Sequence, residues 1–456
     1  MTDHTPPPLW PHQEAAIAFC EGRRASMLAM EMGTGKTRVA IELLDCWTCD
    51  TALVLAPLSV CSVWPPQVAL HSSRDWRVTN LTGMSIAKRQ ALLPAASSLA
   101  RSEQRPHLVI CNYDALSFKS LAGALNTHHG WDALILDESH RIKSPSGKQS
   151  WACAEIAKAS TRRLALTGTP MPHSPLDIYS QFRALDRTVF GWGWANFRSR
   201  YAVMGGYESK QVVGYRHLAE LHEKLYANAF RVRADDVLTL PDVTEATRTC
   251  VLSRAAREVY DALVAQLMVE VENGKINPSN GLVRLLRLSQ ITGGTVGTDN
   301  QPQRIDSAKA DLLGEVLTDI AADEPVVVFC RYTADLNAVH EQAAKLGRGS
   351  AELSGRRKDL ATWQAGGPPI LAVQIQSGGV GIDLTRARYC IYYSLSWSLG
   401  EFEQSKARVH RPGQERPVTY LYLTAEDTVD ETIIRALARK ARVVDSVIDR
   451  LREATP

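Results

Sequence analysis

The sequence predicts an α/β protein built from two parallel-sheet lobes, with helical insertions between them. Short apolar runs rich in β-branched residues recur along the chain, and helix-forming stretches separate them. Runs of this kind, bounded by turn residues, are typical of buried strands in a parallel sheet. They fall into two sets, the first at 52–56, 108–111, 133–136 and 163–167, and the second at 325–330, 370–374, 389–393 and 418–422.

The interval between the two sets is different, and it suggests the domain boundaries. It is poor in buried runs and carries amphipathic stretches at 255–272 and 282–291. We expect an N-terminal lobe with a helical extension over 1–240, a helical insertion or hinge over 241–306, and a C-terminal lobe over 307–456. At about 150 residues per domain, a chain of 456 residues is compatible with two or three domains.

Composition and charge exclude several classes of protein. The chain is 45% hydrophobic, and 52 Lys and Arg against 49 Asp and Glu leave a net charge of +3. A disordered tail protein is therefore excluded, and no run of about 18 apolar residues offers a membrane span. The first ten residues lack a secretion signal, and nine scattered cysteines suggest reduced thiols, so we expect a cytoplasmic protein. The charge of +3 gives no hint of a nucleic-acid partner.

A candidate phosphate site lies in the segment Met27–Thr37. The loop Gly33-Thr34-Gly35-Lys36-Thr37 has glycines that let backbone N–H groups turn inward, a lysine for the β- and γ-phosphates and a hydroxyl for Mg²⁺. A helix-forming stretch comes directly after it. Met30 occupies the first glycine position of the full consensus, so the loop alone is also compatible with a chance glycine-rich turn.

A pair of acidic residues completes the candidate ATP site. Asp137 and Glu138 end the apolar run at 133–136, and His140 follows them. Asp137 is suited to hold Mg²⁺, and Glu138 to orient and deprotonate the attacking water. Two acids at a strand end are common in solvated turns, but the combination with a phosphate loop favours catalysis.

These residues together resemble helicase superfamily two, and within it the sucrose-non-fermenting family of chromatin-remodeller-like DNA translocases. The resemblance covers nearly the whole chain and implies two RecA-like lobes, with ATP and Mg²⁺ as cofactors. It places Gln13 against the adenine edge and makes Glu31–Thr37, including Met32, the phosphate loop, where the family usually has Asp in place of Met30. The segment 137–140 is close to the family's Asp-Glu-Ala-His form, and Ser139 is the departure.

The resemblance also implies contacts with DNA and a coupling function in the first lobe. The motif at 55–60, with Trp64, is similar to one on which the family grips a DNA strand, and the segment 112–113 occupies the place of another strand contact. Hydroxyl groups in the segment 167–170 are placed to couple hydrolysis to lobe movement through the acidic segment. The implied DNA contacts are Pro57, Ser59, Asn112 and Tyr113, and the implied coupling residues are His140, Thr167 and Thr169.

In the second lobe, two further motifs resemble the family. Segment 377–385 is similar to the motif that touches DNA backbone and nucleotide, although Asp383 stands where the remodellers more often have Asn. Segment 404–414 matches the arginine-finger motif, and the spacing of Arg408 and Arg411 predicts that they share one helix face. Taken alone, that segment would equally be a basic surface helix. The implied roles are DNA contact for Ser377, Gly378 and Trp397, nucleotide contact for Gly381 and Asp383, and coupling for Gln404.

The mechanism that these motifs suggest is closure of the two lobes around ATP. Lys36, Thr37, Asp137 and Glu138 would act from one side, and Arg408 and Arg411 from the other. If each lobe also binds a nucleic-acid backbone, alternating closure and opening would move the two binding surfaces along that backbone. Local hydroxyls, backbone N–H groups and a few cations can hold phosphates without a high global charge.

Three functions remain open at this point. The first hypothesis is an ATP-dependent translocase on double-stranded DNA that remodels or displaces bound material. The second is a strand-separating helicase on DNA or RNA, and the third is a DNA-clamping scaffold whose ATPase activity matters little. We expect a recruiting protein as a further partner, no membrane association, and a bacterial or phage-infected cell as the setting.

Overall fold

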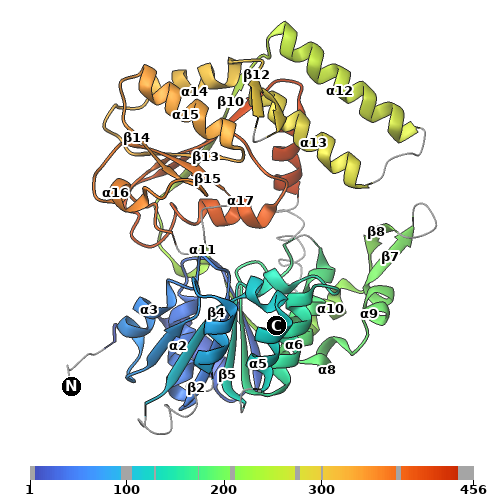
Figure 1. The fold of residues 1–456 in the computed structure, drawn as a ribbon, viewed down its shortest axis with the longest axis vertical. Coiled ribbons are helices and arrows are strands. Elements are labelled where there is room, and N and C mark those ends of the chain that lie inside the picture. Colours follow the sequence, from blue (N-terminus) through green and yellow to red (C-terminus); the bar gives the residue numbers. More distant parts are fainter. Residues whose placement is uncertain are drawn as a thin grey trace. The chain divides into compact units, whose positions relative to one another are not determined.

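The computed structural model describes residues 6–93, 105–127, 130–172, 174–205, 211–272, 278–298, 301–375 and 382–439. These residues form two compact units, and the chain passes from unit 1 to unit 2 between Thr239 and Leu240. Each unit is built around one large parallel β-sheet (Figure 1). The predicted α/β class with two parallel-sheet lobes is confirmed.

The sheet of unit 1 brings the candidate ATP-site loops together. It has seven strands in the order β3-β4-β2-β5-β6-β1-β9, and every neighbouring pair is parallel. The carboxyl ends of all these strands therefore lie at one edge, which is where open α/β sheets bind ligands. The strands are β1 (Ala25–Met30), β2 (Thr51–Ala56), β3 (Arg77–Asn80), β4 (His107–Asn112), β5 (Trp131–Asp137), β6 (Ser160–Leu166) and β9 (Ala229–Val232).

Helices cover both faces of this sheet because its strands are apolar on both sides. Leu28 and Val54 pack with one group of helices, and their neighbours Met27 and Leu53 pack with the other, as the alternation of side chains along a strand requires. The first group is α1 (Pro11–Glu21), α2 (Lys36–Cys46) and α3 (Trp64–His71), and the second is α5 (Lys119–Thr127), α6 (Lys148–Lys158) and α7 (Ile178–Leu185).

Smaller elements complete unit 1. They are the 3₁₀ turns η1 (Tyr113–Ser117), η2 (Ser139–Ile142) and η3 (Pro175–Asp177), the helices α8 (Arg187–Phe190), α9 (Trp194–Tyr201), α10 (Leu218–Tyr226) and α11 (Ala234–Val237), and the hairpin of β7 (Ala202–Gly205) and β8 (Gln211–Tyr215). The turn η2 directly follows the carboxylate pair at the end of β5.

Unit 2 repeats the architecture with six parallel strands. Their order is β10-β17-β16-β13-β15-β14, and the four predicted runs of the second set are β13, β15, β16 and β17. No helix within the described ranges of either unit is both long and apolar enough to cross a membrane. The strands are β10 (Val243–Cys250), β13 (Val326–Cys330), β14 (Ser350–Leu353), β15 (Ile370–Gln374), β16 (Tyr389–Tyr392) and β17 (Val418–Ala425), and the other elements are α12 (Arg254–Glu272), α13 (Pro278–Thr292), β11 (Thr295–Thr298), β12 (Gln301–Arg304), α14 (Ala308–Thr318), α15 (Thr333–Lys345), α16 (Leu360–Gln364) and α17 (Leu399–Lys406).

The interval 241–306 differs from the expected helical hinge. It contains α12 and α13, but it starts with β10, which pairs in parallel with β17 and so belongs to the second sheet. The reason for the error is that β10 is an edge strand with most of its residues exposed. Such a strand needs no apolar run, and the pattern of apolar residues could not reveal it.

Candidate active site

The phosphate loop connects β1 to α2, at the carboxyl edge of the sheet of unit 1. Gly33 and Gly35 have φ angles of 83° and 87°, a left-handed conformation that side-chain-bearing residues rarely adopt. A Cβ on Gly35 would also collide with the amide nitrogen of Gln13. The two glycines thus let the chain turn into α2, whose free N-terminal N–H groups favour an anion.

Lys36 lies over its own loop. Its Nζ donates to the carbonyl oxygens of Met30 and Glu31, at 2.8 and 3.2 Å. Both acceptors are neutral, and a phosphate oxygen in their place would make a stronger hydrogen bond, because both partners would then be charged. The side chain of Thr37 is half-buried in the first turn of α2.

Gln13 contacts the phosphate loop directly. Its Oε1 accepts from the Trp10 backbone N–H at 3.0 Å, and its Nε2 donates to the Thr34 carbonyl at 3.3 Å. Nε2 of His12 lies 2.8 Å from that same carbonyl oxygen. The adenine contact of Gln13 stays a prediction, and the structure adds a second role for this residue, which is to hold the loop. His12 was not singled out from the sequence, because a lone histidine carries no signal of this contact.

Asp137 is a buried carboxylate that is held at two points. Oδ2 accepts from the Trp64 indole N–H at 2.9 Å, and its main-chain oxygen accepts from the Tyr113 hydroxyl, also at 2.9 Å. Burial, and then the charge of Glu138, raise the pKa of Asp137 to about 7. A cation would stabilise the ionised form of such a carboxylate, so the residue fits a Mg²⁺ ligand.

Glu138 is the charged member of the pair. Burial alone would raise its pKa, but the hydrogen bond from His140, the charge of His140 and the charge of Lys36 together lower it. Its Oε2 lies 3.3 Å from Nδ1 of His140. The backbone of Glu138 has a φ of 51°, a left-handed conformation between the end of β5 and the turn η2. An ionised carboxylate at this position is available to accept a proton.

The coupling residues of unit 1 lie together. Nδ1 of His140 lies 3.2 Å from Oγ1 of Thr167, which in turn accepts from the Thr169 backbone N–H at 3.1 Å. The hydroxyl of Ser139 donates to Oε1 of Gln181 at 2.7 Å, and Nε2 of Gln181 donates to the Pro170 carbonyl at 2.6 Å. The ends of β5 and β6 are therefore linked twice. Sequence reasoning missed Gln181 because it lies on α7, far along the chain from Ser139.

The implied DNA contacts of unit 1 are not equally accessible. Ser59 is exposed, but Pro57 is buried. Asn112 is buried, and its Oδ1 accepts from Nη1 of Arg89 at 3.0 Å. Tyr113 is only 3% exposed. The side chains of Pro57, Asn112 and Tyr113 are therefore covered or already have an internal partner, and their DNA contacts, like that of Ser59, stay predictions.

The two arginines of unit 2 follow α17. The prediction that they share a helix face is wrong, since α17 ends at Lys406 and Arg408 and Arg411 lie in the turn beyond it. Pro412 disfavours a helical conformation at Arg411, the residue before it. Arg408 is 3% exposed, and burial lowers its pKa to about 10. Within the part of unit 2 that the structure describes, its Nε and Nη1 and the Nε of Arg411 have no hydrogen-bond acceptor.

Hydrogen bonds tie the arginine turn to the segment 382–387. The backbone N–H of Leu384 donates to the Arg408 carbonyl at 3.0 Å, and Nε2 of Gln414 donates to the carbonyls of Thr385 and Ala387 at 3.1 and 2.9 Å. Asp383 is exposed, and its Oδ1 accepts from the backbone N–H and hydroxyl of Thr385 at 2.9 and 2.7 Å. Gln414 is buried, and its hydrogen bonds hold this turn, a role that the sequence motif does not reveal.

The remaining predicted residues of unit 2 lie in different structural environments. Trp397 is half-buried and packs against the core of unit 2, and Gln404 is half-buried on α17. Ser377, Gly378 and Gly381 lie outside the described residues. Their roles, like those of Trp397, Gln404 and Asp383, stay predictions.

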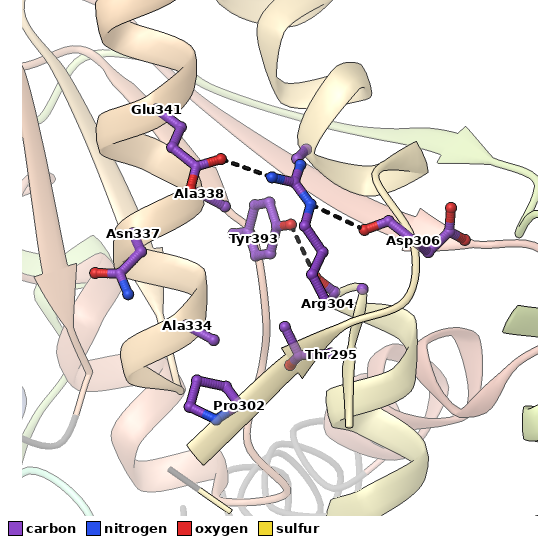
Figure 2. Close-up of a pocket in the computed structure, with 12 residues that line it drawn as sticks. Thr295, Pro302, Arg304, Asp306, Ala334, Asn337, Ala338, Glu341 and Tyr393 are labelled. Atoms are coloured by element: carbon purple, nitrogen blue, oxygen red, sulfur yellow. Dashed lines mark hydrogen bonds and ion pairs between the residues drawn. The ribbon is translucent and has the colours of Figure 1, made fainter. Parts of the chain in front are cut away.

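A small cavity in unit 2 is separate from all of these residues. It has a volume of about 150 Å³ and lies between α15 and the hairpin of β11 and β12 (Figure 2). Arg304 crosses its rim, where Nη1 donates to Glu341 at 2.7 Å, and Tyr393 forms part of its wall. None of the residues predicted for ATP or DNA lines it.

Comparison with known proteins identifies the family. The model of the SNF2-related domain matches residues 12–292, and that of the helicase conserved C-terminal domain matches residues 308–413. The chain belongs to the SNF2-related family. Its two units thus carry helicase-type ATPase domains, as the motifs implied, and the chain is a hydrolase of the helicase type.

Relatives from distant sources share this SNF2-related architecture. Putative protein p41 of Acyrthosiphon pisum secondary endosymbiont phage 1 is 26% identical, over 97% of this chain and 98% of its own length. Chromodomain-helicase-DNA-binding protein 1-like of Mus musculus is 27% identical over 93% of this chain, which spans 48% of that protein. The solved Sulfolobus solfataricus SWI2/SNF2 ATPase core in complex with dsDNA is 22% identical, with a TM-score of 0.45, and the match covers 98% of this chain and 94% of that one.

Proposed function

We propose that this protein is an ATP-dependent translocase on double-stranded DNA that remodels or displaces bound material. The observation that carries the ATP-hydrolysing part of the proposal is the meeting of Lys36, Asp137 and Glu138 at one edge of the sheet of unit 1. Lys36 is close enough to lower the pKa of both Asp137 and Glu138, although more than a hundred residues separate them from it. A phosphate loop and a carboxylate pair in this relation serve the hydrolysis of a nucleoside triphosphate.

Each residue of unit 1 has a defined part in the proposed hydrolysis. The backbone N–H groups of Gly33–Lys36 and the Lys36 ammonium bind the phosphates. Thr37 and Asp137 would hold Mg²⁺, which, when bound, neutralises phosphate charge. Glu138 accepts a proton from the attacking water, and His140 keeps that carboxylate ionised. Through the contact between His140 and Thr167, a structural change at the nucleotide site reaches the end of β6.

Unit 2 would supply positive charge to the reaction. A buried guanidinium with two unpaired nitrogens is unfavourable until an anion accepts from it, and this favours Arg408 as the arginine finger. Arg411 is the second candidate, because its Nε is also unpaired among the described residues of unit 2. Such an arginine contributes about 10³ to 10⁵ in rate.

Double-stranded DNA is the partner that we propose, with a recruiting protein that directs the chain to its site of action. The mouse relative is by name a DNA-binding protein, and the phage relative supports a setting in a bacterial or phage-infected cell. The net charge of +3 argues that the grip on DNA is local, through groups such as Ser59, since charge-driven binding would need a larger excess of cations.

The decisive experiment compares ATP hydrolysis by the full chain with duplex DNA, single-stranded DNA and RNA added separately. We expect duplex DNA to stimulate hydrolysis most, and we expect the chain to displace a triplex-forming strand from duplex DNA while ATP is hydrolysed. Stimulation by single strands alone would support a strand-separating helicase instead. No stimulation by any nucleic acid would support the scaffold. The Lys36→Ala variant controls for contaminating ATPase.

A further inference from the structure

Trp64 is buried in unit 1 and donates a hydrogen bond to the carboxylate proposed for Mg²⁺. It is the first residue of α3, its side chain has no exposed surface, and its Nε1 lies 2.9 Å from Oδ2 of Asp137. An indole N–H is a donor only, so this bond favours the ionised carboxylate and orients one of its oxygens. Apolar packing alone would not require the indole nitrogen to point at Asp137.

Tyr113 holds the same residue from a second direction. It begins η1 immediately after β4, and its hydroxyl donates to the main-chain oxygen of Asp137 at 2.9 Å. In the sheet, β4 pairs with β2 and β2 pairs with β5. The segments after β2 and β4 therefore both reach across to the end of β5 and fix Asp137 there.

The segment that contains Trp64 also reaches the protein surface. Between β2 and α3 the chain makes a tight turn, in which the Val60 and Cys61 N–H groups donate to the Pro57 carbonyl at 2.9 and 3.2 Å. Leu58, at the tip of this turn, is 56% exposed, and Ser59 is exposed beside it. Only a few hydrogen-bonded residues separate this tip from Trp64. A displacement of the tip would therefore also move Trp64. The turn is also the one for which a DNA contact is proposed.

We infer that Trp64 and Tyr113 are positioning residues that orient Asp137 for Mg²⁺ and make its placement respond to nucleic acid at the 57–63 turn. Both halves rest on the proposed function, the first on Mg²⁺ held by Asp137 and the second on the contact with nucleic acid. A hydrogen bond weakens steeply with angle and distance, so a small displacement of α3 would release the Asp137 oxygen. Partners of metal ligands typically change metal affinity or activity by about 10 to 100-fold when they are removed.

The chain offers a matched control for Trp64. Trp76 is 6% exposed, lies in the same unit, and donates from Nε1 to Oδ1 of the buried Asp45 at 2.9 Å. Trp64→Phe and Trp76→Phe therefore each remove one buried indole–carboxylate hydrogen bond and a similar volume. Tyr113→Phe has its own control in Tyr179→Phe, because the Tyr179 hydroxyl donates to the Trp192 carbonyl at 3.1 Å.

The first test measures nucleotide binding without turnover. A fluorescent, non-hydrolysable ATP analogue is titrated into the full chain at a series of Mg²⁺ concentrations and in EDTA. For Trp64→Phe we expect the Mg²⁺ midpoint to rise about 10-fold, with affinity in EDTA unchanged, and for Tyr113→Phe a smaller rise. Both control variants should match the wild type. A wild-type Mg²⁺ midpoint in Trp64→Phe, or an equal rise in Trp76→Phe, would overturn the positioning role.

The second test measures the stimulation of ATP hydrolysis by duplex DNA. We expect Trp64→Phe to lower the ratio of stimulated to basal kcat about 10-fold or more, beyond any loss of basal rate. Equal loss of both rates would overturn the response to nucleic acid. If the wild type itself shows no stimulation, the proposed function fails, but the Mg²⁺ titration still decides whether Trp64 positions Asp137.

Discussion

The charged groups of the two units differ in whether the protein supplies them with hydrogen-bond partners. In unit 1, Lys36 donates to two carbonyls of its own loop, and Asp137 accepts from Trp64. In unit 2, Arg408 is buried with Nε and Nη1 unpaired among the described residues. Unit 1 thus holds the groups proposed for catalysis with internal partners, whereas unit 2 contains a buried cation that an anion would stabilise. The comparison suggests that unit 1 is preorganised and that unit 2 responds to the nucleotide.

The largest expected effect comes from removing the unpaired cation. Arg408→Met should lower the DNA-stimulated kcat by about 10³ to 10⁵. The same change should stabilise the protein by about 1–3 kcal/mol, because it replaces an uncompensated buried charge with an apolar side chain. Steady-state kinetics and urea unfolding measure the two effects.

A second buried arginine in unit 2 supplies the control. Arg348 is 8% exposed, and its guanidinium donates to the carbonyls of Leu317 and Ala321 at 2.8 and 3.1 Å. Arg348→Met should therefore destabilise the protein by about 2–3 kcal/mol. If Arg408→Met destabilises it as much as Arg348→Met, the contrast between the two units is mistaken.

The next effect tests the preorganised site of unit 1. Glu138→Gln should lower kcat by about 10² to 10⁴, because an amide cannot accept the proton of the attacking water. ATP binding should persist, since Lys36 and the loop are unchanged. Stopped-flow hydrolysis and equilibrium binding of ATP separate the two. Normal turnover in this variant would remove Glu138 from the proposed role.

A third prediction concerns the pH dependence of stability in unit 2. Burial raises the pKa of Asp335 to about 6, and its Oδ1 has no hydrogen-bond partner among the described residues. The folded state therefore holds the proton more tightly than the unfolded state does. The contribution of Asp335 to stability is most favourable at low pH, and it falls as pH rises from about 4 to about 6.

Asp335→Asn should remove this pH dependence. The variant should be more stable than the wild type by about 2–3 kcal/mol at pH 7.5, and the advantage should vanish near pH 4. Urea unfolding at both pH values measures the difference. An advantage that does not change with pH would show that repacking, and not the charge, is responsible.

The smallest effect tests how tightly the ends of β5 and β6 are linked. Ser139→Ala restores the residue that is usual in the family and leaves Oε1 of Gln181 without the Ser139 hydroxyl. We expect a loss of about 1–2 kcal/mol of stability with little change in kcat. Ser180→Ala is the control, because the buried Ser180 hydroxyl has no partner within the described ranges, so its removal should be neutral. Equal losses in the two variants would contradict the link.

Much of the fold was predictable because its signals are local. The strands β2, β4 and β5 contain continuous apolar runs, and β6 ends in one at 164–166. The loop at Gly33–Thr37 and the pair at 137–138 are contiguous motifs. The exposed edge strand β10 has no apolar run, and the arginine turn was mistaken for a helix because a spacing of three residues does not show where a helix ends.

The sequence by itself determined two parallel α/β lobes, the phosphate loop, the carboxylate pair and the family. Each depends on residues that are neighbours in the chain or on the alternation of buried side chains. Only the tertiary structure decided that Trp64 and Tyr113 hold Asp137, that Gln13 and His12 hold the loop, and that Arg408 is buried with its Nε and Nη1 unpaired among the described residues. These contacts join residues far apart in sequence, and their partners exist only once the sheet has brought the ends of its strands to one edge.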